Sequence, residues 1–339
     1  MDVTFSNGYA LLIGVGDDRP VTARDAKGLY EVLVDPARAA YPPKQVEPLI
    51  ETNATRDNIL TNFDLLIERV KKNPEATVIV YYSGHGAEIE GSKDEYLLLP
   101  YNYEPKKWAI TGITGLEFTD KIEAIKARKL VVILDCCFAG GIPEVKAYGV
   151  SSLKAAPPPQ NLIDKLDKGS GLVVITSSSQ DEYSYSYSNE KYSVFTSCLL
   201  DALAGKGEKE KDGYAHILEV LIYLSRYIPQ RTGNKQHPFI KKMLDVSDNF
   251  ALCYYAGGLK RVDLPSELKD LMQERATYAN IIKQKTRLRN ELLQKVAVEI
   301  NPVHKDQWMY ELKQVEADLK RYQTKLRKIK QKIDDLDNK

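Results

Sequence analysis

Short, continuously apolar segments that alternate with helical patterns constrain the fold of this 339-residue chain more than any other feature. Ala76–Tyr82 (ATVIVYY) and Leu130–Leu134 (LVVIL) are apolar on both faces, which is typical of strands buried inside a parallel sheet. Between such segments, apolar residues recur every three or four positions, as in an amphipathic helix. The sequence therefore predicts an α/β fold with a mostly parallel sheet flanked by helices. Further strands are expected at Tyr9–Val15, Val46–Ile50, Tyr96–Pro100 and Gly171–Thr176, and helices at Thr22–Val34, Phe118–Ala127, Val194–Leu203 and Ala215–Tyr227.

Two regions depart from this alternation. Residues 142–170 contain a run of three prolines, several Lys and Ser residues and little periodicity, which predicts a long exposed loop. After Pro265 a helix is expected up to Val298, and Asn301-Pro302 would end it before a second helix. We therefore expect a domain at residues 1–260 and a helical hairpin or coiled coil at 266–339. The seam of the second helix comprises Leu312, Val315, Leu319, Tyr322, Leu326, Ile329, Ile333 and Leu336.

Composition narrows the classes of function. Lys and Arg total 48 against 47 for Asp and Glu, so no overall basic field favours nucleic acid or an anionic membrane. No apolar run approaches the roughly 18 residues of a bilayer span, and the first residues lack the pattern of a signal peptide. Four cysteines, two of them adjacent, do not form a disulfide framework. We expect a cytoplasmic protein that binds neither nucleic acid nor membrane, with 266–339 contacting a protein partner or a second copy.

Chemically distinctive residues follow the two central strands. His85 lies between glycines in Ser-Gly-His-Gly, and Cys137 ends the triplet Asp-Cys-Cys. Ligands of such folds bind outside the carboxyl ends of the strands, where these residues are expected to meet. A neighbouring imidazole stabilises a thiolate, which then attacks carbonyl groups. The sequence therefore predicts that Cys137 is a nucleophile with His85 as its base, and that the backbone N–H groups of Gly86 and Cys137 face the oxyanion.

The two motifs carry a resemblance to a known family. Tyr82-Ser-Gly-His-Gly86 and Asp135-Cys-Cys-Phe-Ala-Gly-Gly141 resemble the active-site motifs of the caspase-like peptidases, nearest to the metacaspases and the bacterial orthocaspases. The separation of His85 and Cys137 is close to the about 50 residues of the caspase signature. The resemblance covers roughly residues 6–250 and implies a cysteine endopeptidase, with Cys137 rather than Cys136 as nucleophile. Metacaspases usually have His-Ser after the nucleophile, where this chain has Phe138-Ala139.

The resemblance also implies a substrate preference. Metacaspases cut after Arg or Lys because the pocket for that residue is acidic, whereas the caspase pocket contains Arg and selects Asp. Asp25 and Asp135 are similar to the acidic pocket positions, with Ser83 and Thr22 as walls. Two carboxylates that face Arg or Lys give charge-assisted recognition. From the residues alone, Asp135 could instead cap a turn, Asp25 could be stabilised by the helix dipole, and Arg24 could reverse the preference toward acidic residues.

Self-cleavage and metal binding are open at this stage. The loop at 142–170 offers Lys146, Lys154, Lys165 and Lys168 as self-cleavage points, or it is a connector that is never cut. Many metacaspases bind an activating Ca²⁺, but Asp94, Glu95 and Glu144 form no convincing oxygen-rich loop, so neither a metal nor a cofactor is expected.

A function of another class stays open beside the peptidase. A catalytically silent scaffold would keep the fold and act through residues 266–339. A retained His85 and Cys137 argue against that alternative, because a scaffold has no chemical need for either side chain.

Overall fold

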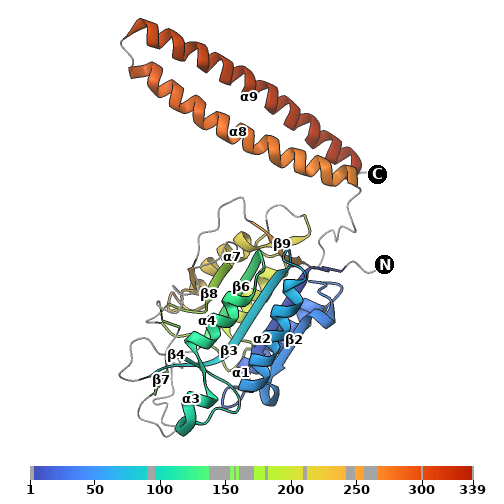
Figure 1. The fold of residues 1–339 in the computed structure, drawn as a ribbon, viewed down its shortest axis with the longest axis vertical. Helices are drawn as coiled ribbons and strands as arrows, with labels where there is room; N and C mark the ends of the chain where they lie inside the picture. The colour runs from blue at the N-terminus through green and yellow to red at the C-terminus, as the bar shows by residue number, and fades with distance from the viewer. Residues whose placement is uncertain are drawn as a thin grey trace. The chain divides into compact units, whose positions relative to one another are not determined.

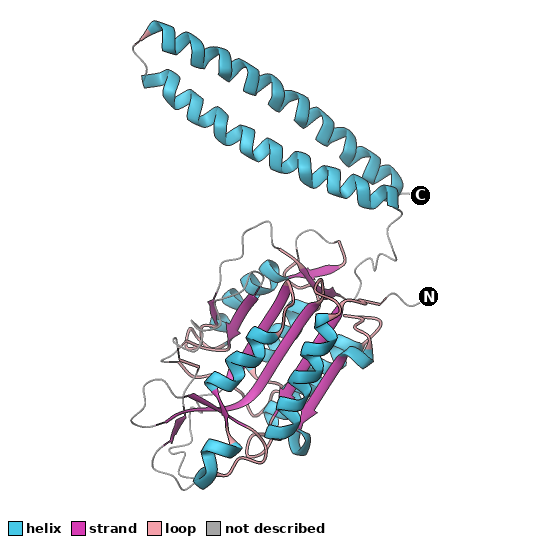
Figure 2. Cartoon of the chain, viewed as in Figure 1, coloured by secondary structure: helices cyan, strands magenta, loops and turns pink. Residues whose placement is uncertain are grey.

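The computed structural model describes residues 4–89, 96–136, 153–155, 158–159, 172–179, 182–208, 212–241, 249–255, 266–298 and 301–337. Two compact units, residues 1–260 and 261–339, make up the chain (Figure 1). The first unit is an α/β sandwich whose sheet lies between two layers of helices (Figure 2). Its strands are β1 (Gly8–Gly14), β2 (Val46–Ile50), β3 (Thr77–Ile89), β4 (Tyr96–Leu99), β5 (Ile113–Thr114), β6 (Lys129–Cys136), β7 (Leu153–Ala155), β8 (Leu172–Thr176), β9 (Tyr214–His216), β10 (Phe239–Lys241) and β11 (Ala251–Tyr254). Its α-helices are α1 (Pro20–Val34), α2 (Arg56–Lys71), α3 (Trp108–Thr111), α4 (Gly115–Ala124), α6 (Val194–Leu203) and α7 (Ile217–Arg231).

The main sheet has the strand order β10-β8-β6-β3-β1-β2. Every neighbouring pair from β8 to β2 is parallel, and β10 runs antiparallel to β8. The central position of β3 follows from its composition, because a β-branched and aromatic strand that is apolar on both faces is stable only when both faces are covered. The carboxyl ends of β1, β3 and β6 therefore lie together at one edge.

Each face of the sheet has its own core. Alternate strand residues pack against α1, α6 and α7 on one face, with Leu12, Tyr81 and Ile133 at the centre. The other face packs against α2 and α4, with Val80, Tyr82 and Leu134 at the centre. Because the side-chain period of a strand is two, Tyr81 and Tyr82 project to opposite cores from adjacent positions. Figure 1 shows α2 and α4 on one side of the strands, as these contacts require.

Two strands extend beyond the lengths expected from the sequence. Ala76–Tyr82 was expected to be the whole central strand, but β3 continues to Ile89 and pairs with β4 and β7 after it leaves β6. Asp135, Cys136 and Cys137 were expected to follow the next strand, but β6 extends to Cys136 and so includes the first two of them. His85 and Asp135 are thus strand residues and not loop residues. The reason is that backbone pairing on both sides continues through polar and glycine positions.

Part of the segment expected to be an exposed loop is regular structure. Residues 153–155 form β7, which pairs antiparallel with β3, and Lys154 lies opposite Glu88. Pro158 is buried. The prediction of one long exposed loop over 142–170 is therefore wrong for these positions, because the exposed edge of the β3 extension offers them a partner.

The second unit is a pair of long helices, α8 (Ser266–Val298) and α9 (Pro302–Asp337). The break at Asn301-Pro302 falls where the sequence predicts it. Leu292, Val315 and Leu319 form its buried core. Ion pairs join the helices, among them Lys285 to Asp318 at 2.7 Å and Arg289 to Glu316 at 3.1 Å. Among the described residues, no helix combines the length and apolar character needed to cross a bilayer.

We expect residues 1–260 to fold without the helical pair. Within the part of the chain that the structure describes, the buried clusters of the first unit are built from its own strands and helices, and the cluster of the second unit is built from α8 and α9. A protein truncated after residue 260 should melt cooperatively within about 4 °C of the full chain, measured by circular dichroism. A non-cooperative transition would contradict this independence.

Candidate active site

His85 is held at the carboxyl edge of the sheet by backbone contacts on both sides. It pairs with Leu99 of β4, and the hydroxyl of Tyr82 lies 2.9 Å from the His85 carbonyl oxygen. The residue before His85 is Gly84, and only glycine fits there, because a Cβ would lie 2.7 Å from a methyl of Val15 and 2.8 Å from the Tyr82 hydroxyl. The imidazole is largely covered, with 14% of the side chain exposed.

The imidazole contacts a carboxylate that the sequence analysis did not single out. Asp18 Oδ1 lies 2.7 Å from His85 Nε2. The hydrogen bond to His85 is the main cause that lowers the pKa of Asp18 below its usual range. Asp18 follows β1 on the loop before α1. The signal that could have found it is the Asp-Asp pair after the first predicted strand, since that strand ends at the same edge as His85.

The loop that carries Asp18 is fixed at both ends. The N–H of Val15 donates to the Ser83 carbonyl oxygen at 3.0 Å, which joins the loop to β3. Gly16 adopts a φ of 77°, a conformation that favours glycine, and its N–H donates to the Thr22 hydroxyl at 2.8 Å. That hydroxyl in turn donates to the Arg19 carbonyl oxygen at 3.0 Å. Thr22 therefore braces this loop, whereas the sequence predicts that it lines a substrate pocket.

The predicted nucleophile, Cys137, lies outside the described residues, as does its backbone N–H. The residue before it is described: Cys136 is buried in the core beneath α2 and α4. Cys136 is the register partner of Gly84 across the β3–β6 ladder. The chain positions that follow this pair are His85 and Cys137. Gly86, the other predicted oxyanion donor, is a buried residue opposite Leu98 of β4.

Asp25 and Asp135 form a buried group that we call the acid pair. Asp25 comes from α1 and Asp135 from β6, and both are completely inaccessible to solvent. Ser193, the N-cap of α6, bridges them: its N–H donates to Asp25 Oδ1 and its hydroxyl donates to Asp135 Oδ2, each at 2.9 Å. The hydroxyl of Ser184 donates to Asp135 Oδ1 at 2.9 Å. The N-terminus of α6 thus faces two carboxylates, which its dipole favours.

The acid pair is electrostatically strained. Burial, together with the nearby charge of Asp135, raises the pKa of Asp25 to about 8. Burial also raises the pKa of Asp135, and hydrogen bonds from neighbouring serines oppose that rise. Asp25 Oδ2 is buried and accepts no hydrogen bond within the described part of the chain. Two carboxylates at one buried position make an environment that favours a cation.

The other residues predicted for the pocket lie in different environments. Ser83 is buried in β3 opposite Asp135, and its hydroxyl makes no hydrogen bond to a described residue. Arg24 turns to the surface, where its Nε–H donates to the Lys191 carbonyl oxygen at 2.8 Å. Its charge still lowers the pKa of Asp25, while Arg19 lowers the pKa of both Asp18 and Asp135. The sequence analysis considered Arg24 and missed Arg19.

Of the residues predicted for self-cleavage or for calcium, only Lys154 belongs to the described part of the chain. Lys154 lies in β7 by its backbone. The other predicted self-cleavage points and the three acidic residues considered for calcium fall outside the described residues, namely Lys146, Lys165, Lys168, Asp94, Glu95 and Glu144.

A family comparison is consistent with this arrangement of strands and helices. A model of the caspase domain matches residues 7–247. The chain belongs to the caspase-domain family. Membership makes it a hydrolase of the cysteine peptidase class, which acts on protein or peptide substrates. A comparison with curated proteins finds no match.

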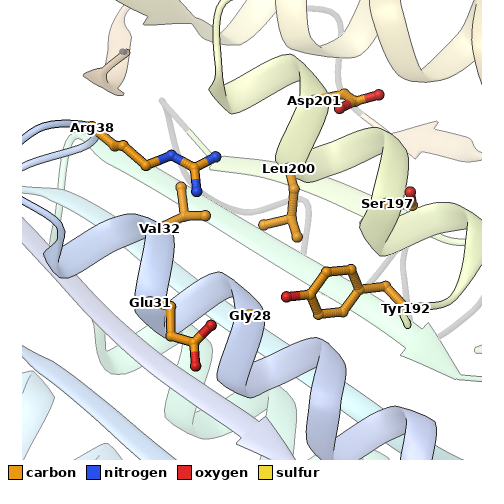
Figure 3. Close-up of a pocket in the computed structure, with 8 residues that line it drawn as sticks. All are labelled: Gly28, Glu31, Val32, Arg38, Tyr192, Ser197, Leu200 and Asp201. Carbon is orange, nitrogen blue, oxygen red and sulfur yellow. The ribbon is translucent and has the colours of Figure 1, made fainter. Parts of the chain in front are cut away.

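A separate hollow of about 240 Å³ lies between α1 and α6 (Figure 3). The ring of Tyr192 lies beside Gly28, where a Cβ would come within 2.4 Å of that ring. Arg38 reaches between Val32 and Leu200, and the remaining lining residues are Glu31, Ser197 and Asp201. The hollow lies further along α1 than Asp25 and includes neither member of the acid pair.

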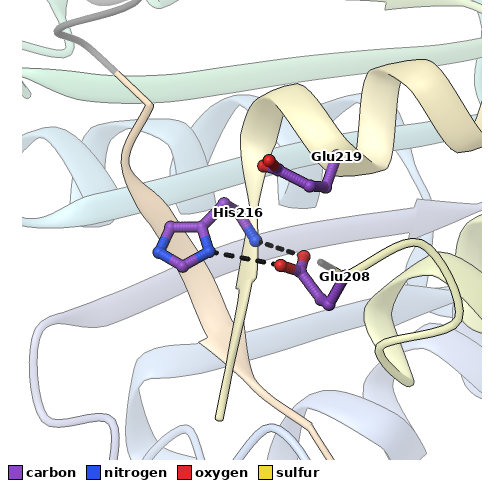
Figure 4. A group of neighbouring side chains, drawn as sticks. All are labelled: Glu208, His216 and Glu219. Atoms are coloured by element: carbon purple, nitrogen blue, oxygen red, sulfur yellow. Dashed lines mark hydrogen bonds and ion pairs between the residues drawn. The ribbon is translucent and has the colours of Figure 1, made fainter. Parts of the chain in front are cut away.

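A second group of ionisable side chains lies at the opposite end of the sheet. His216 of β9 faces Glu208 and Glu219, and their nearest ligand atoms are within 4.8 Å of one another (Figure 4). The strand paired with β9 contacts Thr77, the first residue of β3, eight residues before His85 and therefore about 26 Å away along the strand. Glu208 accepts from His216 at both its N–H and Nδ1, and only 2% of its side chain is exposed. The imidazole of His216, when protonated, therefore balances the charge of the buried Glu208 carboxylate.

We expect the acid pair to lower stability at neutral and higher pH. An acid whose pKa is raised on folding contributes stability below its unfolded value, here 3.8, and this stability is lost as pH rises through about 8. Asp25→Asn removes the ionisation, so its free energy of unfolding relative to wild type should increase by roughly a few kcal/mol between pH 4 and pH 8. Urea unfolding measures this difference. Asp120→Asn, at an exposed position on α4, is the matched control, and equal pH trends for the two variants would contradict the expectation.

His216 should also contribute stability that is lost as pH rises, in this case through the loss of a positive charge. The hydrogen bond to Glu208 raises the pKa of His216, with further contributions from Asp212 and Glu219. Such a group stabilises the protein below its unfolded pKa, and the stabilisation is lost as pH rises through the folded value. His216→Gln should therefore cost about 1 kcal/mol at pH 5 and less at pH 9, measured by thermal or urea unfolding. A cost that does not change with pH would contradict this assignment.

Proposed function

We propose that the protein is a cysteine endopeptidase that uses Cys137 and His85 and cuts after Arg or Lys. The observation that carries this proposal is the acid pair, because it provides two buried carboxylates at the same sheet edge as His85. Ser83 of β3 is paired with Gly14 of β1 and with Asp135 of β6, and His85 lies two residues further along the same strand. This chemistry favours the metacaspase and orthocaspase branch of the family, whose pocket is acidic.

The proposed reaction needs no cofactor. The thiol of Cys137 transfers its proton to His85, and the thiolate attacks the scissile carbonyl carbon. Backbone N–H groups at Gly86 and Cys137 would stabilise the oxyanion of the tetrahedral intermediate. The imidazolium then gives its proton to the leaving amine, which leaves an acyl-enzyme. Water, deprotonated by His85, hydrolyses the thioester and restores the thiol.

The acid pair suits a guanidinium or ammonium group for two reasons. Asp25 Oδ2 is a buried acceptor that lacks a donor in the described part of the chain, so an entering cation would supply one. The raised pKa of Asp25 shows that a second negative charge is costly without a counter-charge. A bound Arg or Lys side chain offsets that cost and gains charge-assisted hydrogen bonds.

A preference for acidic residues is the competing specificity, and one observation favours it. Nη1 of Arg19 is buried and makes no hydrogen bond to a described residue, and Arg19 is close enough to lower the pKa of Asp135. An acidic substrate side chain would give this guanidinium an acceptor. The acid pair opposes that binding mode because it adds like charge. A silent scaffold that acts through α8 and α9 is the remaining alternative, and regulation through these helices belongs to the same proposal.

Hydrolysis of fluorogenic peptides ending in Arg, Lys or Asp is the direct test. We expect cleavage after Arg and Lys by the full-length protein, and a loss of at least about 1000-fold in kcat/KM for Cys137→Ala. Cys136→Ala is the matched control, because the neighbouring thiol is buried in the core and should be dispensable for the reaction. Asp135→Asn should lower kcat/KM for Arg peptides by about 10- to 100-fold, since it removes a buried charge that contacts the substrate.

The outcomes separate the alternatives. Cleavage only after Asp, abolished by Arg19→Ala, would replace the acidic pocket with Arg19 as the specificity residue. Equal activity of Cys137→Ala and wild type would exclude the proposed nucleophile. Absence of cleavage by the full chain and by residues 1–260, with and without Ca²⁺, would favour the scaffold.

A further inference from the structure

Asp18 is the one carboxylate in the described part of the chain that contacts the imidazole of His85. His85 comes from β3 and Asp18 from the loop between β1 and α1, and the 2.7 Å between Oδ1 and Nε2 is the distance of a charge-assisted hydrogen bond. Asp17, the preceding residue, is exposed and has no hydrogen bond or ion pair to a described residue. The contact is therefore specific to one member of the Asp-Asp sequence.

We propose that Asp18 is a positioning residue that orients His85 and stabilises its protonated form during catalysis. This inference rests on the proposed Cys137–His85 reaction and adds a third member to it. With Nε2 engaged by Asp18, proton exchange with the thiol takes place at Nδ1. The thiol proton moves to Nδ1, the thiolate forms, and the positive charge of the imidazolium is balanced by the carboxylate at Nε2. Asp18 keeps its negative charge throughout.

The loop geometry makes this contact more than a surface ion pair. Exposed pairs contribute little because two mobile side chains must be ordered, but here both backbones are already fixed. β3 holds His85 through β4, and the loop of Asp18 is anchored by Val15 to Ser83 and by Gly16 to Thr22. Asp18 is only partly covered, with 38% of its side chain exposed, so that its replacement leaves no cavity in the core.

Charged groups at the carboxyl edge of the sheet come from three elements. The loop after β1 contributes Asp18 and Arg19, α1 contributes Asp25, and β6 contributes Asp135. Arg19 lowers the pKa of both Asp18 and Asp135, so its charge affects the carboxylate beside His85 as well as the acid pair. Of these groups, Asp18 makes the hydrogen bond to His85 Nε2, so its loss should change the charge balance of the imidazole directly.

The experiment compares Asp18→Asn, Asp18→Glu and Asp17→Asn in the full-length protein. Peptide hydrolysis gives kcat and KM, and alkylation by iodoacetamide as a function of pH reports thiolate formation at Cys137. The other cysteines of the described chain, Cys136, Cys198 and Cys253, are buried, and Cys137→Ala defines the background. Alkylation does not depend on substrate specificity, so it tests Asp18 even where no peptide is cut.

We expect Asp18→Asn to lower kcat by about 10- to 100-fold with KM changed less than about twofold. Its alkylation profile should move about one pH unit upward, because the imidazolium that stabilises the thiolate has lost its counter-charge. Asp18→Glu should recover part of kcat, and Asp17→Asn should match wild type in every measurement. Thermal unfolding should show that Asp18→Asn is folded.

Three outcomes would overturn the inference or the function separately. Wild-type kcat and an unchanged alkylation profile in Asp18→Asn would overturn the positioning role while the peptidase stands. A rise in KM with kcat unchanged would also overturn it, because Asp18 would then act on substrate binding. A shifted alkylation profile without hydrolysis of any peptide would support the role of Asp18 and overturn the proposed endopeptidase activity.

Discussion

The burial of two carboxylates at the carboxyl edge of the sheet is the constraint on which the surrounding structure depends. Asp25 and Asp135 come from different layers, a helix and a strand, and neither reaches solvent. The N-terminus of α6 must lie above them, because Ser193 donates one hydrogen bond to each. The positions of α1, α6 and β6 are therefore coupled through polar contacts as well as through the apolar core. Such coupling is costly for stability and is typical of sites kept for binding or catalysis.

The sequence predicts the fold well, for physical reasons, and the site stays a prediction built on that fold. Strands that are apolar on both faces require a covered parallel sheet, and the carboxyl edge of that sheet is then the expected site. His85 and Asp135 were found because glycine and polar residues follow such strands directly. The strand ends were less predictable: β3 continues past His85 because β4 and β7 supply backbone partners, and pairing between distant segments leaves little local signal.

Asp18 and Arg19 show where sequence reasoning stops. Both lie in the short segment between β1 and α1, and their directions depend on the left-handed conformation of Gly16 and on two hydrogen bonds to other elements. Spacing alone does not distinguish Asp18 from Asp17, or Arg19 from Arg24. Thr22 was expected in the pocket because of the family resemblance. In the structure its hydroxyl accepts a hydrogen bond from the Gly16 N–H and donates one to the Arg19 carbonyl oxygen, both within this segment.

The pairing of β6 with β8 determines how the folded protein would respond to cleavage of the chain between these two strands. The two strands lie side by side in parallel, with Leu130 opposite Leu172 and Leu134 opposite Thr176, although residues 137–171 connect them in the chain. A break anywhere in that connection removes no ladder hydrogen bond between them. A nicked molecule would separate into two bands under denaturing conditions and still migrate as one particle in its native state. Cleavage in this connection would therefore increase the number of polypeptide chains and leave one folded domain.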